Sequence, residues 1–354
     1  MSIHRSQVAL AAGCLLLGGW LGARLFTRSG DAAPTVSAAP AVAPAAPAVA
    51  GSGSGAHSCD ALRNFPLLAA PPGCRGERLR DKRPLDALTK ALQASLDAET
   101  QAGLVTRAAI YVRDLENGPV AAIHEDEPFA PASLLKLPVA MAVWDFALER
   151  PEILDTPMLY AESNIPNFRL LSQQFAFRSD LPPAATVSVR DLLRSSLTYS
   201  DNLAFFLVLE QMNFREQQGP AALQRSFQEL GIIDPPTGKE DVLTVHNYAA
   251  LFRSLYRASY LSETASQEIL SWMAASPFDV GLAAGLPKVV PVAHKFGERA
   301  GTGGSKQLHD CGVVYLPGNP YQVCVMSEGP AWEPLERFIA GVSKASYLAF
   351  VARR

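Results

Sequence analysis

The sequence predicts an α+β fold in which a five-stranded, mostly antiparallel sheet is flanked by helices and joined to a separate all-helical lobe. Three observations support this prediction. Two runs of β-type composition open the folded part of the chain, a long block with helical patterns covers residues 189–275, and three further β-type runs precede a last amphipathic helix. Because the helical block separates the two groups of strands, the simplest assembly is one sheet built from both ends and a second lobe built from the middle. A cleft between the lobes is the expected place for a site.

Each element follows from a local pattern. Leucines at positions 85, 88, 92 and 96 recur at helical spacing, and an Asn-Gly turn separates the first two β-type runs. Pro131 favours the start of a helix just after it. The expected strands cover residues 105–114, 120–124, 289–295, 310–316 and 321–326. The expected helices cover 83–100, 133–149, parts of 189–275 and a last segment with Leu335, Phe338, Ile339 and Val342.

The first 29 residues are expected to be a signal anchor or a signal peptide rather than part of the fold. An apolar run over residues 8–22 follows the basic residue Arg5, which is typical of a targeting segment. No clear small-x-small cleavage site follows, which favours an uncleaved anchor, and the run before Cys14 is short for a lipoprotein signal. Residues 30–57, rich in Ala, Pro and Gly, predict a disordered linker. The domain is therefore expected to be exported and tethered to the outer face of the cytoplasmic membrane, or periplasmic or secreted if the signal is cleaved.

Four of the five cysteines form two local pairs outside the targeting segment. Cys59 and Cys74 lie in a lead-in over residues 58–83, and Cys311 and Cys324 flank a Pro-Gly-Asn-Pro turn. In an exported protein this arrangement predicts two disulfides. Metal binding is the alternative, but the chain has no Cys-x-x-Cys and no spaced pair of histidines to support it.

Composition and charge exclude some functions. The chain is 48% hydrophobic and 18% charged, with a formal net charge of −3. These values are typical of a globular protein, and no basic run with interleaved aromatic residues suggests a nucleic-acid partner. Nothing in the sequence calls for a metal or an organic cofactor.

Three short motifs carry the chemistry. Ser133-Leu-Leu-Lys136, Ser200-Asp-Asn202 and Lys295-Phe-Gly297 occur in this order, 67 and then 95 residues apart. A serine hydroxyl needs a base within hydrogen-bond reach to act as a nucleophile. Residues three apart on a helix share one face, so the Lys136 amine is expected to reach the Ser133 hydroxyl. A serine in the first helical turn also places backbone N–H groups near a developing oxyanion.

Each motif also has a purely structural explanation. Ser133 and Lys136 can share a helix face by chance, and Ser200-Asp-Asn202 has the composition of a helix N-cap. Lys295-Phe-Gly297 reads as the end of a strand followed by a glycine turn. All three explanations must hold at once, and in order, for the functional interpretation to fail.

At this point the chain resembles the penicillin-recognising serine enzymes, the class A β-lactamases and penicillin-binding proteins, which carry Ser-x-x-Lys, Ser-Asp-Asn and Lys-[Thr/Ser]-Gly in the same order. The flanking segments 132–138, 197–202 and 292–295 with 309–315 are similar to class A sequences. The resemblance covers roughly residues 84–352 and implies a β-lactamase-like catalytic domain over 84–354, with the fold predicted above.

The resemblance implies a catalytic role for four residues. Ser133 would be the acylated nucleophile, and Lys136 would be its general base or the partner of that base. Ser200 would pass the proton to the leaving nitrogen. Lys295 would keep the site positive for Ser200 and for a substrate carboxylate.

It also implies how a substrate would be held. Asn202 would hold the side-chain amide of the substrate, and the absence of a side chain at Gly297 would allow the substrate backbone to approach closely. The backbone N–H groups of Ser133 and Glu298 would form the oxyanion hole.

The chain departs from the family pattern at two places. Phe296 stands where the family has Thr or Ser, whose hydroxyl contacts the substrate carboxylate, and this indicates a more apolar substrate or a decayed site. No Glu-x-x-x-Asn loop follows the second motif; Asp234 and Glu240 are the carboxylates in the comparable, shorter stretch. A solvated turn is the favoured interpretation for both carboxylates. We therefore expect Ser133 to be acylated and the acyl group to leave slowly.

Three functions remain open from the sequence. The first is a β-lactamase-type serine hydrolase acting on β-lactams or related amides. The second is a penicillin-binding DD-peptidase-like enzyme acting on peptidoglycan peptides. The third is a surface binding module that keeps the fold without turnover. A monomeric domain, attached to the membrane only through its anchor, is expected in each case.

Overall fold

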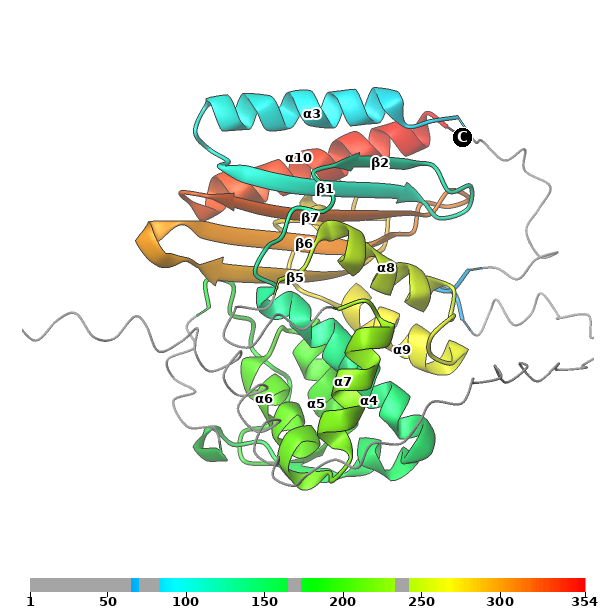
Figure 1. The fold of residues 1–354 in the computed structure, drawn as a ribbon, viewed down its shortest axis with the longest axis vertical. Coiled ribbons are helices and arrows are strands. Elements are labelled where there is room, and N and C mark those ends of the chain that lie inside the picture. The colour runs from blue at the N-terminus through cyan, green and yellow to red at the C-terminus, as the bar shows by residue number, and fades with distance from the viewer. Residues whose placement is uncertain (1–64, 70–82, 165–172, 233–241, 354) are drawn as a thin grey trace, which may run out of the picture.

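The five-stranded sheet is present as predicted. A computed structural model describes residues 65–69, 83–164, 173–232 and 242–353. Within these residues the strand order is β2-β1-β7-β6-β5, and every neighbouring pair is antiparallel (Figure 1). The two ends of the domain meet where β1 pairs with β7. The strands are β1 (Arg107–Asp114), β2 (Val120–Ile123), β5 (Val292–Ala300), β6 (Lys306–Val314) and β7 (Tyr321–Gly329).

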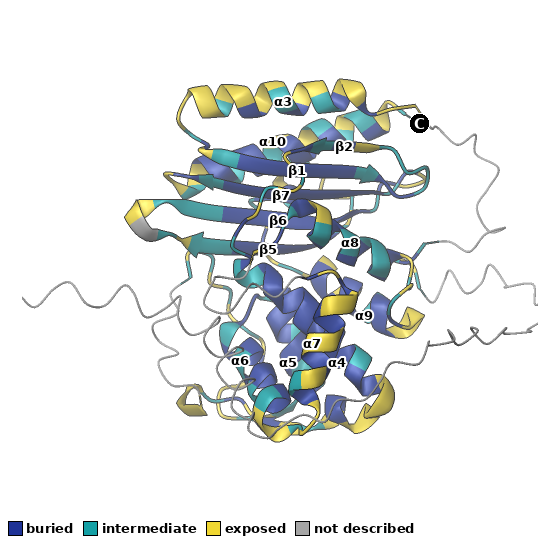
Figure 2. Cartoon of the chain, in the orientation of Figure 1, coloured by how far each residue is buried: buried dark blue, intermediate teal, exposed yellow. Residues whose placement is uncertain are grey.

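The first and last helices, α3 (Asp86–Gln101) and α10 (Trp332–Val351), pack together and cover one face of the sheet. Leu88, Leu92 and Leu96 are buried because residues four apart lie on the same side of a helix. They belong to one hydrophobic core with the strand side chains that face them. Figure 2 shows the central strands mostly buried and the outer side of α3 exposed.

The opposite face of the sheet packs against α8 and a helical lobe, which together form a second hydrophobic core. The lobe lies beside β5 in Figure 1. The central helix of this lobe, α4 (Lys136–Glu149), is buried along most of its length. Its burial explains why its sequence is apolar without a clear polar side. The helices of this half are α4 (Lys136–Glu149), α5 (Val189–Thr198), α6 (Asn202–Glu210), α7 (Gly219–Glu229), α8 (Val245–Tyr256) and α9 (Glu263–Ala274).

Polar side chains define where several of these helices begin. Ser188 and Asp191 form a capping box at the start of α5, each side chain accepting a backbone N–H of the other's residue. The side chains of Thr244 and Ser262 cap α8 and α9 in the same position. The α5 and α6 boundaries matter for function because the second motif lies between them.

The structure corrects the expected bounds of several strands and adds several short elements. The strand expected over 310–316 is β6, Lys306–Val314, and the strand expected over 321–326 continues to Gly329. Lys295-Phe-Gly297 does not end its strand: β5 continues to Ala300, and Val289 is not part of it. The strand continues because Gly297 and the residues after it pair with β6 through to Lys306. The added elements are the two-stranded ribbon β3 (Pro157–Leu159) and β4 (Thr186–Ser188), the 3-10 turns Ala132–Leu135, Pro151–Asp155, Glu162–Asn164, Leu282–Gly285 and Thr302–Gly304, and a π-helical turn Gln211–Arg215.

One predicted disulfide lies within the described residues, and it is present. Cys311 and Cys324 are directly opposite each other on β6 and β7, with 3.9 Å between their Cα atoms. The predicted pair Cys59 and Cys74 lies outside the described residues, as do the targeting segment and the linker. In the part of the chain that the structure describes, no helix is both long and apolar enough to cross a membrane.

Candidate active site

The first motif lies where a 3-10 turn passes into α4. Ser133 is in the turn and Lys136 is the first residue of the helix. The Lys136 Nζ donates to the Ser133 Oγ at 2.8 Å, as the spacing predicted. The serine is partly exposed, whereas the lysine is buried. Ala132, just before the nucleophile, has a φ of +47°, a conformation that non-glycine residues adopt only when the surrounding structure holds them there.

The second motif forms the turn between α5 and α6. Ser200 has a φ of +56° and a fully buried side chain. Asp201 is the N-cap of α6 and accepts the N–H of Ala204 at 3.1 Å. Its carboxylate also accepts the hydroxyls of Tyr160 and Ser195, at 2.7 and 2.8 Å. The structural explanation of the motif is therefore correct, and the same cap places Ser200 in the site.

Ser200 connects the two lysines of the site. Lys136 Nζ donates to Ser200 Oγ at 3.2 Å, to the Ser200 carbonyl oxygen at 2.9 Å and to Asn202 Oδ1 at 2.7 Å. From the opposite side, on β5, Lys295 Nζ donates to the same Ser200 Oγ at 3.0 Å and to the Phe296 carbonyl oxygen at 2.8 Å. The predicted catalytic residues Ser133, Lys136, Ser200 and Lys295 thus form one continuous hydrogen-bonded chain, with Asn202 beside it.

Burial shifts the proton affinity of both lysines. Desolvation lowers the pKa of Lys136 from 10.5 to about 7, although the charges of Asp201 and Glu298 act in the opposite direction. Desolvation and the neighbouring charge of Lys136 lower the pKa of Lys295 well below its usual value. An amine with a pKa near neutrality exchanges a proton readily, which is the property that a general base needs.

Gly297 lies directly against the turn that carries Ser133. A Cβ on this glycine would lie 3.1 Å from the Leu134 backbone nitrogen and 3.1 Å from the Pro131 carbonyl oxygen. The turn that carries Ser133 therefore packs directly on β5, and only glycine fits there without a shift. Part of the site itself therefore lies against Gly297, and the expected approach of a substrate backbone at this glycine stays a prediction.

Phe296, the departure in the third motif, belongs to the core. Its ring is 1% exposed and stacks on Phe278, with 4.1 Å between ring centroids. The rings of Phe175 and Phe177 approach it edge-on. The Lys295 ammonium lies 4.3 Å from the ring centroid, a distance at which the aromatic face attracts a cation. The ring therefore contacts the lysine from within the core and does not offer an open apolar surface.

The side chain of Glu298 makes a contact that the sequence gave no sign of. Its carboxylate accepts the backbone N–H of Gln174 at 2.8 Å and that of Phe175 at 3.0 Å. Burial raises the pKa of this carboxyl group. Gln173, which precedes Gln174 in the chain, donates from Nε2 to the Ser200 carbonyl oxygen at 3.3 Å. The segment over residues 173–175 thus lies between the helical lobe and the end of β5 and contacts both.

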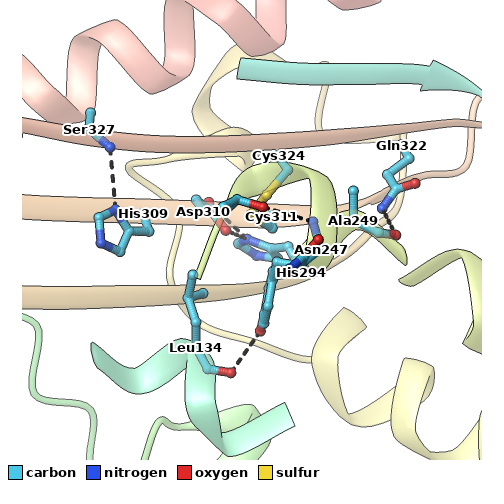
Figure 3. Close-up of a disulfide and its surroundings, with 12 residues drawn as sticks. Leu134, Asn247, Ala249, His294, His309, Asp310, Cys311, Gln322, Cys324 and Ser327 are labelled. Atoms are coloured by element: carbon cyan, nitrogen blue, oxygen red, sulfur yellow. Dashed lines mark hydrogen bonds and ion pairs between the residues drawn. A yellow bond between two sulfur atoms is a disulfide. The ribbon is translucent and has the colours of Figure 1, made fainter. Parts of the chain in front are cut away.

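His309 is hydrogen-bonded to the segment that leads into the turn with Ser133. Its Nδ1 accepts the N–H of Ser327 at 3.3 Å (Figure 3). Its Nε2 therefore carries the proton and donates to the Ala130 carbonyl oxygen at 3.0 Å. Burial lowers the pKa of His309 to about 4, which keeps the ring neutral at physiological pH. A second side chain contacts the same turn. The Tyr248 hydroxyl donates at 3.0 Å to the carbonyl oxygen of Leu134, which is four residues after Ala130. Neither residue belongs to a motif, because each acts through a partner distant in the sequence.

Other predicted residues fall outside the site or outside the described residues. Asp234 and Glu240, the carboxylates considered for deacylation, lie outside the described residues. Over the described parts of the chain, no group of three or more His, Cys, Asp or Glu side chains is arranged to hold a metal ion.

Comparisons with known proteins agree with this geometry. A model of the β-lactamase enzyme family matches residues 87–350. A β-lactamase of Bacillus licheniformis is 22% identical over 271 residues, which cover 72% of this chain and 82% of the relative. The extended-spectrum β-lactamase PER-1 of Pseudomonas aeruginosa is 28% identical over 180 residues, 46% of this chain and 57% of the relative.

Solved structures show the same fold. An ancestral class A β-lactamase superposes with a TM-score of 0.59 at 25% identity, covering 74% of this chain and 99% of the other. A variant of PBP-A, in an acyl-enzyme complex with penicillin G, gives a TM-score of 0.60 at 21% identity, covering 77% of this chain and all of the other. The chain has the fold of the class A β-lactamases and belongs to the β-lactamase enzyme family of serine hydrolases.

Proposed function

We propose that this protein forms an acyl-enzyme on Ser133 with β-lactams or with related amides and esters, and that it releases the acyl group slowly. The observation that carries the proposal is the 2.8 Å hydrogen bond between Ser133 Oγ and a buried Lys136 amine. A lysine of this kind can remove the proton from a serine at neutral pH.

In the proposed acylation step, Ser133 Oγ attacks the carbonyl carbon of the substrate while the uncharged Lys136 amine takes the hydroxyl proton. A tetrahedral intermediate forms, and the backbone N–H groups of Ser133 and Glu298 stabilise its oxyanion. The bond from the carbonyl carbon to the leaving nitrogen then breaks. The proton moves from Lys136 through the Ser200 hydroxyl, 3.2 Å away, to that nitrogen. Lys295 holds the Ser200 hydroxyl in place from the other side.

Slow release follows from what the second step requires. Deacylation needs a base that activates water beside the acyl group. The chain lacks the Glu-x-x-x-Asn loop that supplies this base in class A β-lactamases, and its nearest substitutes, Asp234 and Glu240, do not form that motif. The PBP-A variant captured as an acyl-enzyme with penicillin G is a relative in fold whose acyl group persists long enough to be observed.

We also propose the setting in which this chemistry takes place. The apolar run over residues 8–22 and the linker over 30–57 support an exported domain tethered to the outer face of the cytoplasmic membrane. A domain held there meets both β-lactams and peptidoglycan peptides, and it acts as a monomer.

The test uses the full-length chain, its Ser133→Ala variant and two reagents, a fluorescent penicillin and a chromogenic cephalosporin. The proposal predicts stable fluorescent labelling of the wild type, none of the variant, and little turnover of the cephalosporin. Rapid turnover would show an efficient β-lactamase and contradict slow deacylation. An absence of both labelling and turnover would contradict acylation by β-lactams and favour a binding module.

A further inference from the structure

Glu298 combines two features that bear on how a substrate would be held. Its backbone N–H is one of the two oxyanion donors of the proposed function, and its side chain is a partly buried carboxylate. That carboxylate accepts two backbone N–H groups, from Gln174 and Phe175, so its position is fixed. A substrate whose carbonyl oxygen binds at the Glu298 N–H therefore lies within one side chain's length of a fixed negative charge.

Charges of both signs act on one another at the site. In the part of the chain that the structure describes, the carboxylates of Asp201, Glu298 and Asp310 act through their charge on Lys136, on Lys295 or on both. Burial lowers the pKa of both lysines and raises the pKa of Glu298, so it disfavours the charged form of all three groups. His294 lies against Asp310, with 2.9 Å between Nδ1 and the carboxylate.

Of these carboxylates, Glu298 is the one that a substrate meets. Asp201 is 8% exposed and Asp310 is fully buried, and each is engaged by other groups of the protein. Glu298 follows Gly297 on the strand that packs against the nucleophile's turn, and it retains some exposure. Its charge is therefore presented at the end of the site where β5 and the segment over residues 173–175 meet.

We propose that Glu298 determines specificity by favouring acyl donors that are uncharged at the end that lies against β5, so that a donor with a carboxylate there, as in a penicillin, acylates Ser133 more slowly than an uncharged amide or ester. The proposal rests on the proposed function, since it concerns what Ser133 accepts. An anionic group at this end faces the Glu298 carboxylate in a partly dehydrated site, where like charges repel strongly. A neutral amide or a cationic group there donates a hydrogen bond to the same carboxylate or pairs with it.

The test compares two hippuryl thioesters that differ in one group, a leaving thiol that ends in a carboxylate or in a carboxamide. In both, Ser133 Oγ forms a bond to the thioester carbon, the carbon–sulfur bond breaks, and the thiol leaves with the serine proton. Thiol release gives the second-order rate constant of acylation, and mass spectrometry of the full-length chain identifies acylated Ser133. We expect the carboxamide to react at least about tenfold faster, a modest ratio for one like-charge contact.

The Glu298→Gln variant tests the cause. Each carboxylate oxygen accepts one of the two N–H groups, so glutamine keeps an acceptor for one of them and removes the charge. The preference should then fall to about twofold or less. Glu298→Asp, which keeps the charge, should retain the preference. Asp97→Asn is the matched control, because Asp97 is an exposed carboxylate on α3, at the other edge of the sheet (Figure 1). Added salt should reduce the preference in the wild type, an outcome that needs no variant.

Two results overturn the inference, and they are distinguishable. If Ser133 is acylated but the carboxylate thioester reacts as fast as or faster than the carboxamide, the specificity proposal alone is wrong. The same holds if Glu298→Gln leaves the ratio unchanged. If neither thioester nor the fluorescent penicillin acylates Ser133, the proposed function itself fails and the inference fails with it.

Discussion

The rate of Ser133 acylation should depend on pH through the protonation of Lys136. The uncharged amine is the base in the proposed step, and burial lowers its pKa to about 7. Lowering the pH protonates the amine and removes the base. The acylation rate should therefore be constant above the pKa and fall as the pH drops through it.

The expected size of the effect follows from that pKa. For a group with a pKa of about 7, roughly half is uncharged at pH 7, about 9% at pH 6 and about 1% at pH 5. Acylation at pH 5 should thus be about 100-fold slower than on the alkaline plateau. A lysine with its ordinary pKa of 10.5 would instead give a rate that still rises tenfold per pH unit above pH 8, with no plateau below about pH 10.

The assay is the labelling rate with a fluorescent penicillin between pH 5 and 9, at constant ionic strength. Glu298→Gln provides a second check, because the Glu298 charge raises the pKa of Lys136 and its removal should move the midpoint to lower pH. The exposed Asp97→Asn control should leave the midpoint unchanged. A profile that is flat between pH 5 and 8, or one that still rises steeply above pH 8, would refute the role assigned to Lys136.

Three further predictions concern the groups that support the site. His309→Phe removes the hydrogen bond to the Ala130 carbonyl oxygen and should slow labelling of Ser133 about tenfold or more. His309→Gln can still donate and should recover most of the rate. Equal labelling rates in the two variants would argue against a positioning role for this hydrogen bond. Gly297→Ala should lower the free energy of unfolding by about 1–3 kcal/mol in urea denaturation, since its Cβ meets backbone atoms at 3.1 Å, and an unchanged midpoint would mean that the turn moves freely. Replacing Cys311 and Cys324 together by alanine should lower the free energy of unfolding by about 3 kcal/mol, the value for closing a loop with a sequence separation of 13; a loss below about 1 kcal/mol would contradict the assignment of a stabilising crosslink.

Much of the site could be predicted because its chemistry lies in short segments. Ser133 and Lys136 are three residues apart at a helix start, and local geometry alone places the amine against the hydroxyl. Cys311 and Cys324 flank one hairpin, so their pairing is also local. The sheet follows from similar reasoning, because only the two ends of the domain have β-type patterns. In each case the informative interaction is close in sequence or repeats with a regular period.

The remaining features depend on contacts between distant segments. The Glu298 carboxylate is bound by the backbone of residues more than 120 positions earlier, and backbone groups leave no signal in a sequence. His309 reaches Ala130 across 179 positions. The end of β5 was misplaced because a Phe-Gly step looks like the end of a strand, whereas pairing with β6 extends the strand to Ala300. Local propensity was overridden by tertiary pairing at this point.

The second motif shows how a structural role and a catalytic role can depend on the same residues. Asp201 caps α6 and accepts two further hydroxyls, and these bonds fix the residue that follows the strained Ser200. With its φ at +56°, the Ser200 backbone turns its carbonyl oxygen to Lys136 and its hydroxyl to both lysines. A relaxed backbone at this residue would turn one of the two groups away. The N-cap therefore fixes the residue next to the strained Ser200, and an N-cap composition in a sequence is not by itself evidence against a catalytic serine beside it.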